Sequence, residues 1–128
     1  MWIGLFLTPI QMPLLFSYGT LRDPAIQHAV FGRTLSGTAD LLIGYARESF
    51  EVRDPAFVAV HGSRHVIVQH TGRDEDRTSG TVLELTDEEM AMADAYEPAG
   101  YRRVTARFAS GRQGWVYVAD DSTSLSAP

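Results

Sequence analysis

Apolar residues along this chain gather in short runs that glycine, proline and charged residues separate. The first run, residues 12–19 (MPLLFSYG), is continuously apolar, which is typical of a short buried strand. Later segments alternate or cluster apolar residues as strands do. We therefore expect further strands at 38–53, 56–62, 64–72, 79–86, 102–109 and 114–120, with a polar loop at 72–80.

A helix is predicted between the first two strands, in residues 22–32 (RDPAIQHAVFG). Asp23 is a favourable N-cap, and Pro24 suits the first helical position because its missing N–H has no partner there. Gly32 can adopt the left-handed conformation that closes a helix. These three residues mark both ends of the helix.

A second helix is predicted in residues 86–97 (TDEEMAMADAYE). Thr86 followed by Glu89 forms a capping box, in which each side chain accepts from the other residue's backbone N–H. Asp87 and Glu88 suit the positive end of the helix dipole. This is the clearest helix signal in the sequence.

One strand, a helix, a run of strands, a second helix and two final strands form an α+β pattern. So many short strands with few helices are compatible with a small mixed, β-barrel-like sheet flanked by helices, which would leave no exposed sheet edge. We assign residues 13–119 to a single domain. Residues 1–12 are expected to be an N-terminal extension, with Met12 an alternative start, and residues 120–128 a polar tail.

The apolar N-terminal segment resembles a targeting signal only superficially. Pro9 interrupts it, no positive charge precedes it, and it is too short to span a bilayer. We therefore expect a cytoplasmic protein that does not associate with membranes.

Composition excludes several classes of function. The 16 acidic and 11 basic residues give a net charge of −5, whereas nucleic-acid binding requires a basic surface. The chain has no cysteine, which excludes disulfides, thiolate nucleophiles and Cys-ligated metals. It also has no lysine, because all 11 basic residues are arginine, and this excludes Schiff-base chemistry.

Among the acidic residues, Glu97 has no simple structural explanation. It shares one helical face with Met90 and Ala93, and Pro98 disfavours helix at Glu97 itself. If this face packs inward, the carboxyl group ends the helix against apolar surroundings. Desolvation would then raise its pKa toward neutral pH, where a carboxyl group can transfer protons. The alternative is a structural ion pair of Glu97 with Arg102 or Arg103.

Other residues suggest chemistry less strongly. His61 and His65 have a spacing that binds metal on a helix, but Gly62 and Ser63 lie between them and the flanking segments are predicted strands. Ser17 and Ser63 lack the sequence context of a hydrolase nucleophile. We therefore predict no metal site and no serine nucleophile.

The sequence resembles the gamma-glutamylcyclotransferase family over residues 13–118. Tyr18-Gly19-Thr20-Leu21 is similar to the family's substrate loop, and Glu97, after Asp94 and Tyr96, to its acid/base glutamate. Tyr101 and Arg103 are similar to its Tyr-x-Arg motif, and Tyr117 to its late aromatic strand residue. Because no residue separates Thr20 from Leu21, the resemblance is closer to the compact gamma-glutamylamine-type and uncharacterised bacterial members than to glutathione-directed branches.

The resemblance implies an enzyme without cofactor or metal that acts on a small gamma-glutamyl substrate. The α-amine of the substrate would attack its own γ-carbonyl, releasing 5-oxoproline and an amine or amino acid. Glu97 would be the general acid/base. Substrate-binding roles fall to Tyr18, Gly19, Thr20, Leu21, Tyr101 and Tyr117, with backbone N–H groups of the loop binding the oxyanion.

Two other functions remain open from the sequence. The domain could bind a gamma-glutamyl compound in the same pocket without converting it, with Glu97 contacting an ammonium group. It could also associate through its apolar N-terminal segment. The leaving amine and the oligomeric state are not predicted.

Overall fold

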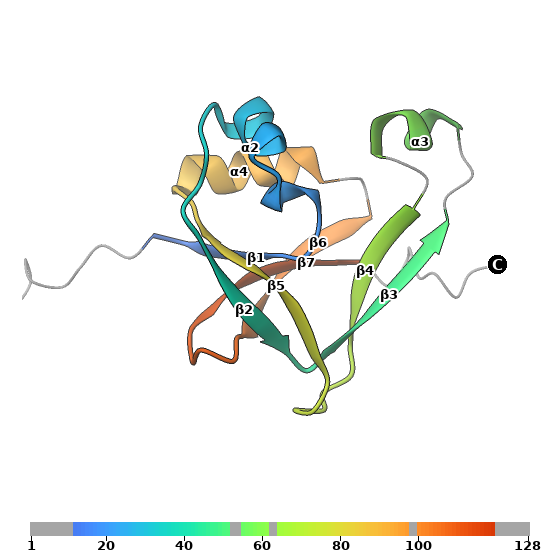
Figure 1. Ribbon diagram of the computed structural model, residues 1–128, viewed down its shortest axis with the longest axis vertical. Coiled ribbons are helices and arrows are strands. Elements are labelled where there is room, and N and C mark those ends of the chain that lie inside the picture. The colour runs from blue at the N-terminus through green and yellow to red at the C-terminus, as the bar shows by residue number, and fades with distance from the viewer. Residues whose placement is uncertain (1–11, 52–54, 62–63, 98–99, 120–128) are drawn as a thin grey trace, which may run out of the picture.

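The computed structural model describes residues 12–51, 55–61, 64–97 and 100–119 (Figure 1). The expected polar tail, and all of the expected extension except Met12, lie outside these residues. No helix in the described ranges is long and apolar enough to cross a membrane.

Five strands form the main sheet, in the order β2-β5-β1-β7-β6. Neighbouring strands are antiparallel except β1 and β7, which are parallel. The bounds are β1 Leu14–Ser17, β2 Gly37–Ile43, β5 Arg77–Glu84, β6 Tyr101–Arg107 and β7 Gln113–Ala119. The first strand in sequence is therefore the middle strand of the sheet.

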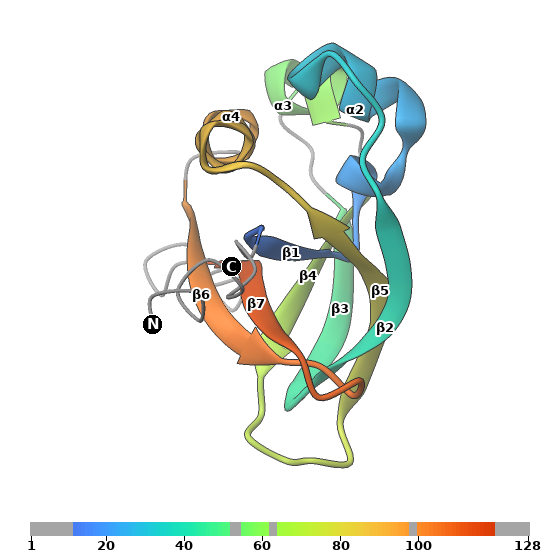
Figure 2. The same cartoon turned by 90° about the vertical axis from the view of Figure 1, so that its left-hand side faces the viewer.

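The sheet curls until its two edges meet. Leu42 of edge strand β2 forms a bridge with Phe108, which directly follows the opposite edge strand β6. The N–H of Ala109 also donates to the carbonyl of Leu41 at 2.8 Å. A two-stranded sheet of β3 (Tyr45–Glu51) and β4 (Arg64–His70) covers the open side (Figure 2). This arrangement confirms the predicted α+β, barrel-like fold.

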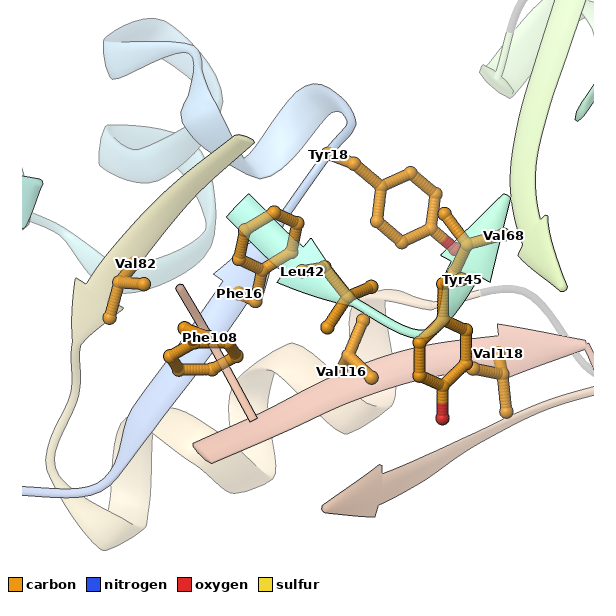
Figure 3. Packing of buried hydrophobic residues seen from close by; sticks show 9 residues of the cluster. All are labelled: Phe16, Tyr18, Leu42, Tyr45, Val68, Val82, Phe108, Val116 and Val118. Carbon is orange, nitrogen blue, oxygen red and sulfur yellow. The ribbon is translucent and has the colours of Figure 1, made fainter. Parts of the chain in front are cut away.

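Because successive side chains of each strand point to opposite faces of the sheet, the apolar core has two layers. Phe16 of β1 belongs to the cluster in the barrel interior that also contains Tyr18, Tyr45 and Phe108 (Figure 3). Leu15 points to the opposite face, where helices α2 (Pro24–Phe31) and α4 (Asp87–Tyr96) pack (Figure 1). Successive side chains of a strand point to opposite faces, so β1 contributes to both layers.

The predicted helix caps are present. The Asp23 side chain accepts from the Ala25 N–H at 2.9 Å, and Gly32 adopts a left-handed φ of 78°. Thr86 and Glu89 form both hydrogen bonds of the capping box, at 2.9 and 3.1 Å. Local sequence signals therefore place α2 and α4 correctly.

Three predicted elements differ from the structure. Residues 56–62 were expected to be a strand, but α3 (Pro55–His61) is a helix, because a short apolar run has no periodicity that separates the two and Pro55 favours a helix start. The predicted strand 38–53 is broken at Gly44, whose φ of 84° turns the chain from one sheet into the other. The loop predicted at 72–80 ends earlier, since β5 begins at Arg77.

Candidate active site

The central strand β1 ends in the predicted Tyr-Gly-Thr-Leu segment. Tyr18 is buried, and its hydroxyl donates to the carbonyl of Tyr117 on β7 at 2.7 Å. The chain then leaves the sheet at Gly19 and turns into the short 3₁₀ helix η1 (Thr20–Arg22). The segment is therefore held at the end of the barrel by a strand on one side and a helical turn on the other.

The loop presents backbone donors without acceptors. Gly19 and Thr20 are exposed, and the N–H groups of Thr20 and Leu21 have no hydrogen-bond acceptor among the described residues. A Cβ atom on Gly19 would meet nothing within 4 Å. Leu21 as a whole residue is buried against the helix-side core, so the exposed backbone of the loop is that of Gly19 and Thr20. An exposed N–H group without an acceptor suits a negatively charged oxygen.

Glu97 lies at the C-terminal end of α4, beside this loop. Met90 and Ala93 on the same helical face are buried, as predicted. Glu97 itself is the C-cap, with extended dihedrals (φ −66°, ψ 142°) that the following proline favours. The preceding residue, Tyr96, shares a 2.7 Å hydrogen bond with the Thr20 hydroxyl. This bond ties the end of α4 directly to the loop.

The surroundings of Glu97 favour the protonated form. Burial, and secondarily the negative charge of Asp94, raise its pKa from 4.5 to about 7. No ion pair joins Glu97 to Arg102 or Arg103 in the part of the chain that the structure describes, where Arg103 pairs with Asp94 instead. The structural ion pair that the sequence left open is therefore not formed there.

Asp94 organises a polar network next to Glu97. Both of its oxygens accept from the Arg103 guanidinium, at 2.7 and 2.9 Å, and one also accepts from the Tyr117 hydroxyl at 2.7 Å. The Arg103 guanidinium lies 4.5 Å from the ring centroid of Trp115. Tyr117 thus contributes its hydroxyl to Asp94 and its carbonyl to Tyr18, and connects the two halves of the site.

Three buried or partly buried tyrosines lie close enough to Glu97 for its charge to act on them. Burial is the largest cause that raises the pKa of Tyr18, Tyr101 and Tyr117, and the Glu97 charge raises each of them further. All three hydroxyls therefore remain protonated at neutral pH, and those of Tyr18 and Tyr117 donate to the Tyr117 carbonyl and to Asp94.

A cleft of 310 Å³ opens along this polar cluster. It is lined by Asp94, Glu97, Tyr101, Arg102, Arg103, Trp115 and Tyr117. Tyr18 and the Gly-Thr-Leu loop are not part of this lining; they adjoin it through the Tyr18–Tyr117 and Thr20–Tyr96 hydrogen bonds. The described residues include no group of three or more side chains placed to hold a metal ion.

The structure thus brings together the residues predicted from separate parts of the sequence, namely Tyr18, Gly19, Thr20, Leu21, Glu97, Tyr101 and Tyr117. No local sequence pattern indicates that Asp94, Arg103 and Tyr117 form one network. The Tyr-x-Arg motif was visible, but which acid pairs with its arginine depends on how β6 packs against α4. Trp115 packs against the helix-side core and also lines the cleft.

The model of one protein family matches most of the chain. That family is described as gamma-glutamyl cyclotransferase, AIG2-like, and the match spans residues 15–127. No curated protein matches this sequence.

Solved structures share the fold at low sequence identity. An Arabidopsis thaliana protein, At3g28950.1, superposes with a TM-score of 0.68 at 20% identity, over 91% of this chain and 67% of its own. A structure described as a gamma-glutamyl cyclotransferase gives 0.61 at 13% identity, over 85% and 67%. An uncharacterised Homo sapiens protein, loc79017, gives 0.63 at 14% identity, over 88% and 69%. At these identities the similarity concerns the fold.

Proposed function

This chain belongs to the AIG2-like gamma-glutamyl cyclotransferase family, and on that premise we propose that it is a cyclotransferase. It cyclises the gamma-glutamyl group of a small molecule to 5-oxoproline and releases the attached amine or amino acid. Glu97 carries the protons, and the Tyr18–Leu21 loop binds the substrate.

The reaction is an exchange of one amide bond for another within the substrate. Glu97, as a carboxylate, accepts a proton from the α-ammonium group, and the free amine attacks the γ-carbonyl carbon. When the tetrahedral intermediate collapses, the bond to the leaving nitrogen breaks and Glu97 returns its proton to that nitrogen. The second proton on the attacking nitrogen is lost as the lactam forms and is taken up by the released amine, which leaves as an ammonium group. Nucleophile and electrophile belong to one molecule, so no co-reactant is needed and the protein has only to orient them.

A carboxyl group with a pKa of about 7 suits both steps, because it is present in both protonation states at neutral pH. The exposed N–H group of Thr20 is suited to the oxyanion, and the open space around Gly19 allows close approach. Tyr101, protonated beside Glu97, supplies a further hydroxyl group, whereas the Tyr117 hydroxyl donates its one hydrogen to Asp94.

One observation carries the proposal: among the described residues, a partly buried glutamate has no arginine partner and lies beside a loop whose Thr20 N–H has no acceptor. Burial of a carboxyl group is unfavourable unless it is paired, and a fold retains such a group where its reactivity is used. Arg103 forms its ion pair with Asp94 rather than with Glu97, so its guanidinium does not hold the Glu97 carboxyl group in the charged form.

The test is 5-oxoproline release, followed by mass spectrometry. The purified protein is incubated with gamma-glutamyl amino acids, gamma-glutamyl amines, ε-(gamma-glutamyl)lysine and glutathione. Glu97→Gln is assayed alongside, with Glu88→Gln on the exposed start of α4 as the matched control. Release that disappears only in Glu97→Gln supports the proposal. No release from a protein that binds these ligands contradicts it and indicates a binding module.

Gly19→Ala tests the loop. Nothing lies within 4 Å of the added methyl group, so we expect an unchanged melting temperature but about tenfold weaker substrate binding, because the methyl group occupies the approach to the loop. In the control Gly80→Ala, the Cβ atom would lie 2.5 Å from the Ser17 carbonyl oxygen, and we expect a large loss of stability. An unchanged affinity of Gly19→Ala for the substrate would contradict a role of the loop in substrate binding.

A further inference from the structure

Two arginines converge on a single carbonyl of the loop. Nη2 of Arg22 donates to the carbonyl oxygen of Tyr18 at 3.2 Å, and Nη2 of Arg47 on β3 donates to the same oxygen at 3.3 Å. Arg22 also donates through Nε to the Gly19 carbonyl at 3.1 Å. Residues 25 positions apart therefore place two positive charges beside one peptide group of the site.

Neither guanidinium has an acidic partner within the described residues. Elsewhere on this acidic protein, Arg33, Arg73 and Arg103 each pair with a carboxylate at 3.1 Å or less. A carbonyl oxygen is a weak counterpart for two like charges, which repel each other at such close range. Both side chains are exposed, and each guanidinium has more N–H groups than the hydrogen bonds it forms with described residues.

The location connects the pair to the proposed reaction. The Tyr18 carbonyl belongs to the peptide group that precedes Gly19, and the exposed Thr20, whose N–H has no acceptor among the described residues, follows directly. Arg47 also lies close enough to act on the Tyr18 hydroxyl, where burial raises the pKa and the Arg47 charge opposes it. The positive charges therefore border the place where the substrate would lie.

We propose that Arg22 and Arg47 form a carboxylate-binding pair for the gamma-glutamyl substrate. This assignment rests on the proposed function and adds which residues bind the carboxylate of the substrate. Two arginine forks are matched in shape and charge to a carboxylate, which binds them with charge-assisted hydrogen bonds. A gamma-glutamyl compound offers two such groups, the α-carboxylate of the glutamyl part and, when the leaving group is an amino acid, the carboxylate of that amino acid.

The test compares two ligands that differ by one carboxylate, gamma-glutamylalanine and gamma-glutamylethylamine. Their dissociation constants are measured calorimetrically in the Glu97→Gln protein, where turnover does not interfere. Into this protein we introduce Arg47→Gln, Arg47→Lys or Arg22→Gln. The control is Arg107→Gln, which replaces an exposed arginine at the end of β6 and changes the net charge by the same amount.

Loss of a charge-assisted hydrogen bond corresponds to a 10-fold to 100-fold weaker affinity. We expect at least about tenfold for Arg47→Gln, partial recovery in Arg47→Lys, and no change in Arg107→Gln, with melting temperatures that show each variant folded. A loss for gamma-glutamylalanine alone assigns the pair to the leaving amino acid, and a loss for both ligands assigns it to the glutamyl α-carboxylate.

An Arg47→Gln protein that remains folded and binds both ligands as tightly as its parent would overturn the pair. The outcome is independent of the reaction itself. Failure of the cyclotransferase proposal appears as absent 5-oxoproline release by the protein with Glu97 intact, while this binding measurement proceeds with Glu97 replaced.

Discussion

The two ends of helix α4 hold a glutamate each, and their surroundings are opposite. At the N-terminal end, buried Glu89 accepts from Arg33 at 2.6 and 2.8 Å and from the Thr86 N–H at 2.9 Å. The hydrogen bond from Arg33 is the main cause that lowers its pKa to about 2. At the C-terminal end, burial and Asp94 raise the pKa of Glu97 to about 7.

The difference shows what burial alone does not reveal. Both carboxyl groups are removed from water, but donors at one end stabilise the charge and a neighbouring acid at the other end destabilises it. The positive end of the helix dipole also favours the Glu89 charge, whereas Glu97 lies at the negative end. One glutamate therefore stabilises the fold, and the other is suited to proton transfer.

Replacement of Glu97 is expected to have the largest effect, on activity rather than on stability. We expect Glu97→Gln to reduce kcat for 5-oxoproline release by about 10²- to 10⁴-fold, because the general acid/base is lost while shape is kept. Its stability at pH 7.5 should be no lower than that of the wild type. A variant with more than a tenth of the wild-type rate would contradict the assignment.

Replacing Glu89 should have the opposite signature. Glu89→Gln keeps an acceptor for Thr86 but loses the ion pair with Arg33, whose side chain is half exposed. We expect a loss of about 1.5 kcal/mol in the free energy of unfolding, measured with urea, since exposure weakens the pair. The rate of 5-oxoproline release by the folded protein should change less than twofold. A larger loss of rate in the folded protein would contradict the purely structural role of Glu89.

The two glutamates should also give stability opposite pH dependences. The pKa of Glu97 is higher in the folded state than its unfolded value of about 4.5, so its contribution falls as pH rises from about 4.5 to 7, by about 3 kcal/mol. The pKa of Glu89 is lower in the folded state, so its contribution is complete above about 4.5 and is lost as pH falls toward 2. Urea unfolding across pH should show Glu97→Gln lacking the first dependence and Glu89→Gln lacking the second.

The smallest expected effect concerns Asp94. Its charge raises the pKa of Glu97, so Asp94→Asn should move the acidic limb of the kcat/KM profile to lower pH by about half a unit to one unit. In Arg103→Gln the Asp94 charge loses its partner, and the limb should move the other way. Shifts of the same sign in both variants would show that they act through structure alone.

The sequence predicts those parts of the fold that local chemistry determines. Asp23, Gly32 and the Thr86–Glu89 box identify the helix ends because each satisfies backbone groups within a few residues. The apolar run 56–62 was assigned incorrectly, since its conformation depends on what packs against it. The bridge between Leu42 and Phe108 joins residues remote in sequence, and no local pattern encodes it.

The candidate site likewise has features that the sequence predicts and features that depend on tertiary packing. Glu97 was identifiable because helix periodicity and Pro98 together place a carboxyl group at an apolar helix end. The partners of Asp94 were not predictable, because they come from two strands whose register against α4 is a tertiary property. The convergence of Arg22 and Arg47 on one carbonyl was invisible for the same reason.

The most direct test of this account is the titration of the two carboxyl groups themselves. In protein labelled with ¹³C-glutamate, the side-chain carboxyl shifts are followed across pH by NMR and assigned with Glu97→Gln and Glu89→Gln. We expect a midpoint near 7 for Glu97, with Glu89 still ionised far below pH 4. A Glu97 midpoint near the ordinary value of 4.5 would contradict its role as the proton carrier of the site.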